Sequence, residues 1–170
     1  FLTDINKEID RLNSIISDLL TLVSMDSKAM RLNRTTFSLA QVITDTAHRL
    51  QPVAESHHQE LKLALNDRCE MYADCAKLTQ VVYNLMENAI KYTQEGGAIK
   101  VRLIRSGRDA VMTVTDNGPG IPREDQAHIF DRFYRVDKAR SRETGGTGLG
   151  LSIVHQMVLM HGGSVSVESE

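Results

Sequence analysis

Residues 2–23 carry the most regular pattern in the sequence. Apolar side chains recur there at alternating spacings of three and four residues, at Leu2, Ile5, Ile9, Leu12, Ile16, Leu19 and Val23. This heptad pattern predicts one long helix whose apolar stripe packs against another helix. We interpret the helix as part of a dimer-forming bundle. The alternative is a helix that packs back on its own domain.

The remaining periodic segments alternate between helix and strand. Helical periodicity predicts three more helices, the first starting after a cap at Ser38, the second after Asp74, and the third spanning residues 149–161. Alternating apolar and polar residues predict strands at residues 60–65, 99–105, 110–115 and 164–168. This order predicts an α+β fold, a two-layer α/β sandwich with a mixed, mostly antiparallel sheet and three helices, preceded by the long coiled-coil-like helix.

Three parts are expected along the chain. Residues 1–25 form the heptad helix, residues 26–35 are a polar linker, and residues 36–170 form the main domain. We also expect the sequence to end short of this domain's last strand.

Composition narrows the classes of function. Lys and Arg number 20 against 22 Asp and Glu, for a net charge of −2, which does not favour nucleic acid as a partner. No apolar stretch is long enough to span a membrane, and no signal-peptide pattern opens the sequence. Cys69 and Cys75 lack partners at metal-ligand spacing, which indicates a reducing cytoplasm. The pair His57 and His58 could suggest a metal site, but a solvated pair between a helix and a strand is the plainer interpretation.

A polar stripe runs along the helix that is predicted to start after Asp74. Asn84, Asn88, Lys91 and Tyr92 fall on one side of it. Asn88 offers a neutral oxygen to Mg²⁺, and Lys91 can reach a phosphate as a point charge. The alternative is an amphipathic helix whose polar face is only solvated.

The segment Asp116–Pro122 places a carboxylate at a strand end. Asp116 can accept a hydrogen bond from an adenine amine, while Gly118 and Gly120 let the backbone approach the ring. The alternative is an ordinary turn, since the same residue types are common in turns.

A third segment, Gly145–Leu151, is a glycine loop. Gly146, Gly148 and Gly150 are spaced by two, unlike the dinucleotide fingerprint, and Leu151 stands where a P-loop requires lysine. The loop leads into a helix N-terminus, where amides and the helix dipole favour phosphate.

An aromatic and basic segment lies between these two glycine segments. It spans residues 129–135, and we expect Phe130 and Phe133 to anchor one end of a lid to the core. Basic side chains would meet a triphosphate, among them Lys138, Arg140 and Arg142.

In this combination the segments resemble the catalytic ATP-binding domain of bacterial sensor histidine kinases, in the wider group that includes gyrase B subunits and mismatch-repair ATPases. Residues 80–92, 116–122, 129–135 and 145–151 resemble, in this order, the family's asparagine box, first glycine box, F box and second glycine box. The resemblance covers the chain from about residue 35 and implies the Bergerat-type ATP-binding fold. Residues 1–24 resemble the second helix of the family's dimerisation domain.

The resemblance implies roles for individual residues. Asn88 would be the metal ligand for Mg²⁺, and Asn84 would lie close to the ion and the phosphates of ATP. Lys91 and Arg135 would contact phosphate, which gives Asn84, Lys91 and Arg135 catalytic roles through positioning and charge neutralisation. The other implied nucleotide-binding residues are Tyr92, Asp116, Gly118, Gly120, Ile121, Gly146, Thr147, Gly148, Leu149 and Gly150.

Position 84 bears on the type of reaction. Related ATPases that hydrolyse ATP carry a glutamate there, and Asn84 cannot take a proton, which favours transfer to an amino-acid acceptor. Two alternatives remain: an ATP-hydrolysing clamp of the gyrase B or mismatch-repair type, and a non-catalytic dimerisation module.

The family's phosphate acceptor is a histidine followed by an acidic residue. None of the six histidines has that context; His48 comes nearest, but Arg49 replaces the acid. We therefore expect the acceptor upstream of this sequence and no autophosphorylation by this chain alone. The resemblance also implies a homodimer through the N-terminal helix, a response regulator as partner, no nucleic acid, and no direct membrane contact. The parent protein would be anchored in the membrane, with this part in the cytoplasm.

Overall fold

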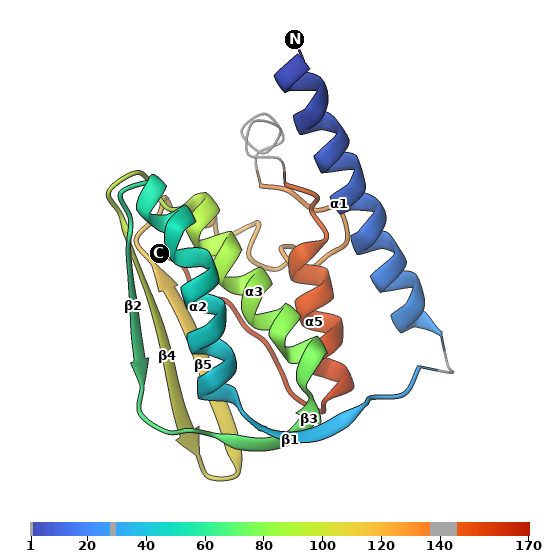
Figure 1. The fold of residues 1–170 in the computed structure, drawn as a ribbon, viewed down its shortest axis with the longest axis vertical. Coiled ribbons are helices and arrows are strands. Elements are labelled where there is room, and N and C mark those ends of the chain that lie inside the picture. Colours follow the sequence, from blue (N-terminus) through green and yellow to red (C-terminus); the bar gives the residue numbers. More distant parts are fainter. Residues whose placement is uncertain (1, 28–29, 137–145) are drawn as a thin grey trace. The chain divides into compact units, whose positions relative to one another are not determined.

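The computed structural model describes residues 2–27, 30–136 and 146–170 (Figure 1). The described elements are, in chain order, α1 (Leu2–Asp26), β1 (Arg34–Ser38), α2 (Leu39–Ser56), β2 (Glu60–Leu65), β3 (Glu70–Asp74), α3 (Cys75–Tyr92), β4 (Ala98–Ser106), β5 (Asp109–Asp116) and α5 (Gly150–Met160). The chain forms two compact units. We call Leu32–Gly120 the sheet unit, and Phe1–Arg31 together with Ile121–Glu170 the helical unit.

The sheet unit is built in two layers. Its larger sheet has the order β2-β4-β5, in which β2 and β4 run parallel and β4 and β5 run antiparallel. Helices α2 and α3 cover one face of this sheet (Figure 1). The mixed sheet with covering helices confirms the predicted α+β fold class.

The core of the sheet unit lies between these layers. Ile43 of α2, Met86 of α3 and Val101 of β4 are fully buried. The alternate residues of β4, such as Lys100 and Arg102, are exposed on the other face of the sheet. The alternation that predicted this strand thus has its physical cause in one buried and one solvated face.

Both predicted helix starts are confirmed. The Ser38 hydroxyl oxygen accepts a hydrogen bond from the Gln41 N–H at 3.3 Å, and the Asp74 carboxylate accepts one from the Lys77 N–H at 3.2 Å. Each cap satisfies an amide that has no partner within its helix.

The sequence did not predict the strands β1 and β3. They pair antiparallel as a separate sheet, with Phe37 opposite Met71, and β1 begins at Arg34 inside the expected linker. Neither strand shows the strict alternation of a half-buried strand. β1 starts with three exposed residues, and β3 ends with two buried ones. Their pairing is a non-local contact that the local pattern does not reveal.

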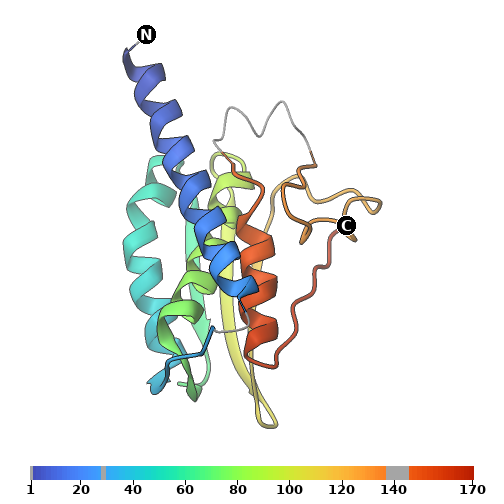
Figure 2. The ribbon, with the colours of Figure 1, turned by 90° about the vertical axis from the view of Figure 1, so that its right-hand side faces the viewer.

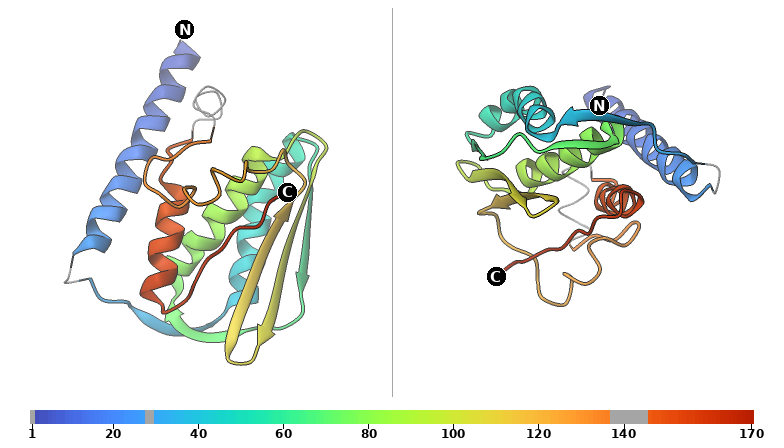
Figure 3. Two further views of the ribbon diagram at one scale, coloured as in Figure 1. Left: turned by 180° about the vertical axis from the view of Figure 1, so that it is seen from behind. Right: turned by 90° about the horizontal axis from the view of Figure 1, so that it is seen from below.

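In the helical unit, α1 runs beside α5 (Figure 3). The predicted helix is confirmed, but its heptad stripe is exposed, from Leu2 at 76% to Val23 at 66%. The neighbouring stripe faces the unit instead, with Leu22 and Met25 buried. Helix α1 therefore packs on its own unit through one stripe and leaves its heptad stripe exposed.

The strand predicted at residues 164–168 is wrong. The segment after α5 forms no strand and runs toward the turns of residues 121–136 (Figure 2). Val165 and Val167 are half-buried, so the alternating pattern reflects partial burial without the ladder of hydrogen bonds that defines a strand. Within the described ranges, none of the helices has the length and apolar character that crossing a membrane requires.

Candidate nucleotide site

The residues predicted to bind nucleotide divide between the two units. Those in the sheet unit are Asn84, Asn88, Lys91, Tyr92, Asp116, Gly118 and Gly120. Those in the helical unit are Ile121, Arg135, Gly146, Thr147, Gly148, Leu149 and Gly150.

The polar stripe of α3 begins at a buried asparagine. Asn84 is only 6% exposed, and its Oδ1 accepts a hydrogen bond from Gln80 Nε2 at 2.7 Å. Asn88 and Lys91 are half-buried further along the helix. Gln80 thus fixes the orientation of the Asn84 carboxamide, a contact that helical spacing allowed but the sequence analysis did not identify.

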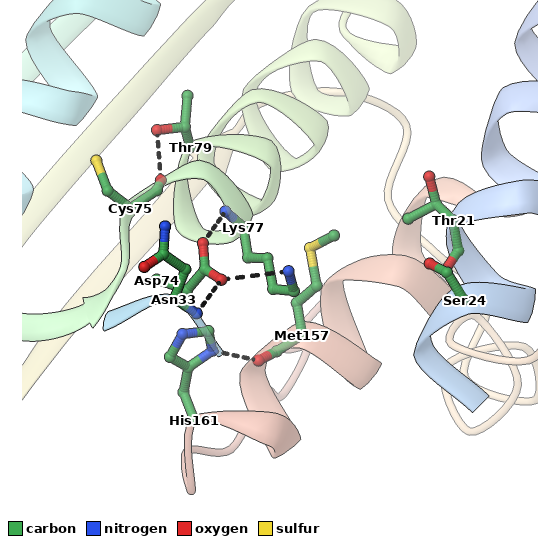
Figure 4. Close-up of polar contacts among 9 residues, drawn as sticks. All are labelled: Thr21, Ser24, Asn33, Asp74, Cys75, Lys77, Thr79, Met157 and His161. Carbon is green, nitrogen blue, oxygen red and sulfur yellow. Dashed lines mark hydrogen bonds and ion pairs between the residues drawn. The ribbon is translucent and has the colours of Figure 1, made fainter. Parts of the chain in front are cut away.

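The start of α3 is held by a buried carboxylate (Figure 4). Asp74 accepts hydrogen bonds from the N–H groups of Asn33 and Lys77, and its Oδ2 lies 3.2 Å from Lys77 Nζ. Burial alone would raise the pKa of Asp74, but the hydrogen bonds from Asn33 and Lys77 outweigh it and hold this pKa below its ordinary value. The anion also sits favourably at the helix N-terminus.

The end of α3 is held by a buried glutamine. Gln59 Nε2 donates to the carbonyl oxygens of Ile90 at 2.9 Å and Thr93 at 2.8 Å. Helix C-terminal carbonyls need such partners when they are buried. The sequence analysis missed Gln59, because nothing in its local pattern shows that it reaches residues more than 30 positions away.

Asp116 stands at the end of β5 and forms a turn with its own backbone. Its Oδ1 accepts a hydrogen bond from the Gly118 N–H at 2.9 Å. The side chain is exposed, and among the described residues Oδ2 accepts no hydrogen bond. The turn that served as the alternative interpretation is therefore present, and it leaves one carboxylate oxygen able to accept from a ligand.

This turn lies against the end of α3. A Cβ atom on Gly118 would come within 2.9 Å of the Tyr92 carbonyl oxygen, so only glycine fits there. Asn117 fixes the turn to β4, because its Oδ1 accepts the Ala98 N–H at 2.8 Å. Gly120 has φ +76°, a conformation that favours glycine. Tyr92, Asp116 and Gly118 are thus brought together, beside the polar stripe of α3.

In the helical unit, the glycine loop is hydrogen-bonded to the aromatic segment of residues 129–135. The Phe133 N–H donates to the Gly148 carbonyl oxygen at 2.9 Å, and a Cβ atom on Gly148 would meet the Phe133 backbone at 3.1 Å. Leu149 is fully buried and directly precedes α5. Gly146 is buried, and Thr147 and Gly150 are half-buried.

Ile121 and Arg135 lie at the two ends of the turn-rich segment. The Ile121 N–H donates to Ser169 Oγ at 2.8 Å, and its carbonyl oxygen accepts from Gln126 Nε2 at 2.9 Å. Arg135 is half-buried. These contacts fix Ile121 to the C-terminal segment of its own unit.

One of the two expected aromatic anchors is wrong. Phe130 is half-buried, and its ring centroid lies 5.6 Å from that of His155 on α5. Phe133 is instead 57% exposed and contacts Gly148 through its backbone, with φ +64°. The expected phosphate contacts of Lys138, Arg140 and Arg142, and the first glycine of the loop, Gly145, lie outside the described residues.

Comparisons with known proteins identify the family. Residues 73–170, more than half of the chain, match the family described as "Histidine kinase-, DNA gyrase B-, and HSP90-like ATPase". The chain is 38% identical over 173 residues to the sensor histidine kinase WalK of Bacillus subtilis (strain 168), an alignment that covers 99% of this chain and 28% of WalK. It is 34% identical over 164 residues to the signal transduction histidine-protein kinase ArlS of Staphylococcus aureus (strain USA300), covering 96% of this chain and 36% of ArlS.

Solved structures agree with these relatives. Full-length ShkA in complex with AMPPNP superposes with a TM-score of 0.84 at 28% identity, covering 99% of this chain and 35% of that chain. The histidine kinase ThkA in complex with the response regulator protein TrrA superposes with a TM-score of 0.74 at 26% identity, covering 94% of this chain and 43% of that chain. The chain therefore belongs to this ATPase family, with the ATP-binding domain of bacterial sensor histidine kinases. It spans between 28% and 36% of the length of the two curated relatives.

Proposed function

We propose that this chain is the ATP-binding catalytic part of a two-component sensor histidine kinase. It would pass the γ-phosphoryl group of ATP to a histidine upstream of this sequence, for onward transfer to a response-regulator aspartate. The observation that carries the proposal is the packing of the Asp116–Gly118 turn against the end of α3. This packing sets an exposed carboxylate beside a helix that bears carboxamides and a lysine.

The turn fits an adenine. Because one Asp116 oxygen is engaged by Gly118 and the other accepts no bond from the described residues, the carboxylate can accept the exocyclic amine of adenine. Gly118 leaves no room for a side chain beside Tyr92, so the backbone can approach a planar ring closely. The half-exposed Tyr92 ring would line the same pocket.

The stripe of α3 fits the metal and phosphates. Asn88 would supply a carboxamide oxygen to Mg²⁺, which prefers oxygen ligands, and Lys91 would contact a phosphate. The remaining phosphate contacts would come from Arg135 and from the amides of the Gly146–Gly150 loop. When bound, Mg²⁺ would supply charge neutralisation on the phosphates of ATP. The acceptor imidazole nitrogen would bond to the γ-phosphorus as the bond from that phosphorus to the ADP oxygen breaks, so that ADP leaves.

Asn84 favours transfer over hydrolysis. Gln80 donates its amide hydrogen to Asn84 Oδ1, which fixes a neutral side chain at this position. A carboxamide cannot accept a proton from water as a general base does. The chain would therefore position the nucleotide and leave activation of the acceptor to groups beside the acceptor histidine.

The partners follow from the exposed surface of α1 and from the relatives. The heptad stripe of α1 would pair with a second copy, giving a homodimer, since such a stripe is typical of helices that bury it against a partner. A response regulator is the expected recipient of the phosphoryl group, as the solved complex of ThkA with TrrA suggests. The parent would be anchored in a membrane and hold this part in the cytoplasm.

Nucleotide binding by single-site variants tests the proposal. We expect Mg²⁺-ATP to bind the chain, measured by calorimetry, and expect Asn88→Ala and Asp116→Ala each to weaken binding at least tenfold, or about 1.4 kcal/mol. Asp109→Ala, an exposed carboxylate at the other end of β5, is the matched control and should bind as the unaltered chain does. Equal affinity in all the variants would reject the assigned residues.

Phosphoryl transfer is tested in the longer parent protein. Radiolabel from the γ-phosphate should appear on an upstream histidine, and Asn88→Ala should abolish it. Steady-state phosphate release without protein labelling would instead favour an ATP-hydrolysing clamp. Failure to bind nucleotide under any Mg²⁺ condition would favour a non-catalytic dimerisation module.

A further inference from the structure

Helix α1 carries a second stripe beside its exposed heptad stripe. The second stripe is displaced by one residue along the sequence and turns toward the helical unit, at Arg11, Ile15, Asp18, Leu22 and Met25. Leu22 and Met25 supply buried apolar contacts on this side, where α1 meets α5. The acidic member of the stripe, Asp18, is therefore held at a fixed place against its own unit.

Asp18 reaches the glycine loop. Its Oδ2 accepts a hydrogen bond from the Thr147 hydroxyl at 2.8 Å. The same hydroxyl oxygen accepts the N–H of Leu149 at 3.2 Å, and Leu149 is the N-cap of α5, without a side-chain cap of its own. A chain of hydrogen bonds thus connects the carboxylate of Asp18 to the N-terminus of α5.

A second aspartate of α1 holds the neighbouring segment. Both carboxylate oxygens of Asp26 accept from Arg132 Nη2 at 2.9 Å. Arg132 immediately precedes Phe133, whose N–H donates to the Gly148 carbonyl oxygen. The glycine loop and the aromatic segment are therefore attached to each other, and each is attached to α1 through a carboxylate.

We propose that Asp18 is an autoinhibitory anion, which occupies the phosphate position of the glycine loop and must leave before Mg²⁺-ATP binds. The inference rests on the proposed function. A helix N-terminus attracts one negative group through its dipole and its free amides. A triphosphate at Thr147 and Leu149 would meet the charge of Asp18 in the same place, and the two anions repel each other.

Competition of this kind couples α1 to the nucleotide in both directions. The measured affinity for ATP is the intrinsic affinity multiplied by the fraction of molecules in which Asp18 has left the loop. By reciprocity, bound ATP weakens the attachment of α1 to the loop by the same factor. Any displacement of α1 along its exposed heptad stripe would then change the affinity for nucleotide.

Removing the charge of Asp18 tests the proposal in the full chain. Asp18→Asn keeps the shape of the side chain but removes the anion, and we expect about fivefold to tenfold tighter binding of Mg²⁺-ATP by calorimetry. Asp10→Asn is the matched control, an exposed aspartate on the same helix, and should bind as the unaltered chain does. Unchanged or weaker binding by Asp18→Asn, with Asp116→Asn still losing affinity, would overturn this inference alone. An absence of binding in every variant would overturn the proposed function together with it.

Hydrogen exchange of the unaltered chain gives a second readout. Adding Mg²⁺-ATP should speed amide exchange in residues 15–26, because the contacts of Asp18 are lost, and leave residues 5–12 unchanged. Slower or unchanged exchange in residues 15–26 at saturating nucleotide would also overturn the inference.

Discussion

The two glycine-bearing segments of the candidate site are held in different ways. Besides the bond from the Gly118 N–H to Asp116, the turn at Asp116 is fixed by neutral hydrogen bonds. The Ala98 N–H of β4 donates to Asn117 Oδ1, and the buried Gln59 donates to the end of the helix on which the turn rests. The glycine loop before α5 is held by one backbone bond, from the Phe133 N–H to Gly148, and by a contact of Thr147 with a carboxylate, Asp18. A regular sheet and helix support the first segment, and a charged group on another helix supports the second.

This difference indicates different behaviour. The hydrogen bonds of Gln59 are buried and neutral, and they specify one geometry, because losing one leaves a desolvated polar group without a partner. A partly exposed charged contact contributes less to stability and is screened by salt, so another anion can replace it. Under the proposed function, we therefore expect the turn to be preorganised for a ring and the loop to exchange a carboxylate for a phosphate.

The largest effect is expected at Gln59. Gln59→Leu removes the donor for the carbonyl oxygens of Ile90 and Thr93 in a buried setting. We expect it to lower the free energy of unfolding by about 3 kcal/mol, measured by urea denaturation. Nucleotide affinity should fall as well, because the end of α3 positions Tyr92.

A half-buried glutamine serves as the control for this substitution. Gln51 Nε2 donates to the exposed Glu55 one helical turn away, at 2.9 Å. Gln51→Leu should change the free energy of unfolding by less than about 0.5 kcal/mol. Equal effects at the two positions would contradict the view that buried donors fix the turn.

Gly97 ranks next in expected effect. A Cβ atom there would lie 2.3 Å from Thr93 Cγ2 and 2.8 Å from Asn117 Oδ1. Gly97→Ala should therefore cost about 2 kcal/mol in urea denaturation, since the end of α3 and the turn must move apart. Gly107→Asn is a fitting control, because its Cβ would meet open space and asparagine tolerates the φ of +62°. Equal stability of the two variants would contradict the close packing at Gly97 between the end of α3 and the turn.

The sequence predicted the regular elements that bear the site. The heptad helix, the helix starts at Ser38 and Asp74, and the hairpin of β4 and β5 all depend on residues close together in the chain. Local periodicity and caps are sufficient for such elements. The same reasoning failed at residues 164–168, where alternation came from partial burial without strand pairing.

The contacts that hold the candidate site could not be predicted in this way. Gln59 reaches Thr93 across 34 positions, and Thr147 reaches Asp18 across 129. A polar residue in a helix or before a strand has the same local pattern whether it is solvated or engaged at such a distance. The motifs therefore predict which residues would face a nucleotide, but not which residues hold those segments in place.

A smaller effect, dependent on pH, is expected at Asp74. The hydrogen bonds that lower the pKa of this carboxyl stabilise the fold fully above its unfolded pKa of about 3.9, and this contribution is lost as the pH falls through the lower folded pKa. Asp74→Asn should cost about 1.5 kcal/mol at pH 7 and show a flatter loss of stability between about pH 5 and pH 2. Asp109→Asn is the exposed control. Urea unfolding at several pH values measures both, and an unchanged acid profile in Asp74→Asn would show that other carboxyl groups dominate.

The smallest effect on stability is expected at the pair of Asp26 and Arg132. Both side chains are about half exposed, and exposed ion pairs contribute roughly 0.5 kcal/mol or less. Asp26→Asn and Arg132→Gln should each change the free energy of unfolding by no more than that, and a double-mutant cycle should give a coupling that disappears in about 1 M salt. A coupling as large as the loss at Gln59, or one that persists in salt, would mean that the helical unit holds its loop as rigidly as the sheet unit holds its turn. The proposed exchange of Asp18 for phosphate would then lose the weak attachment on which it depends.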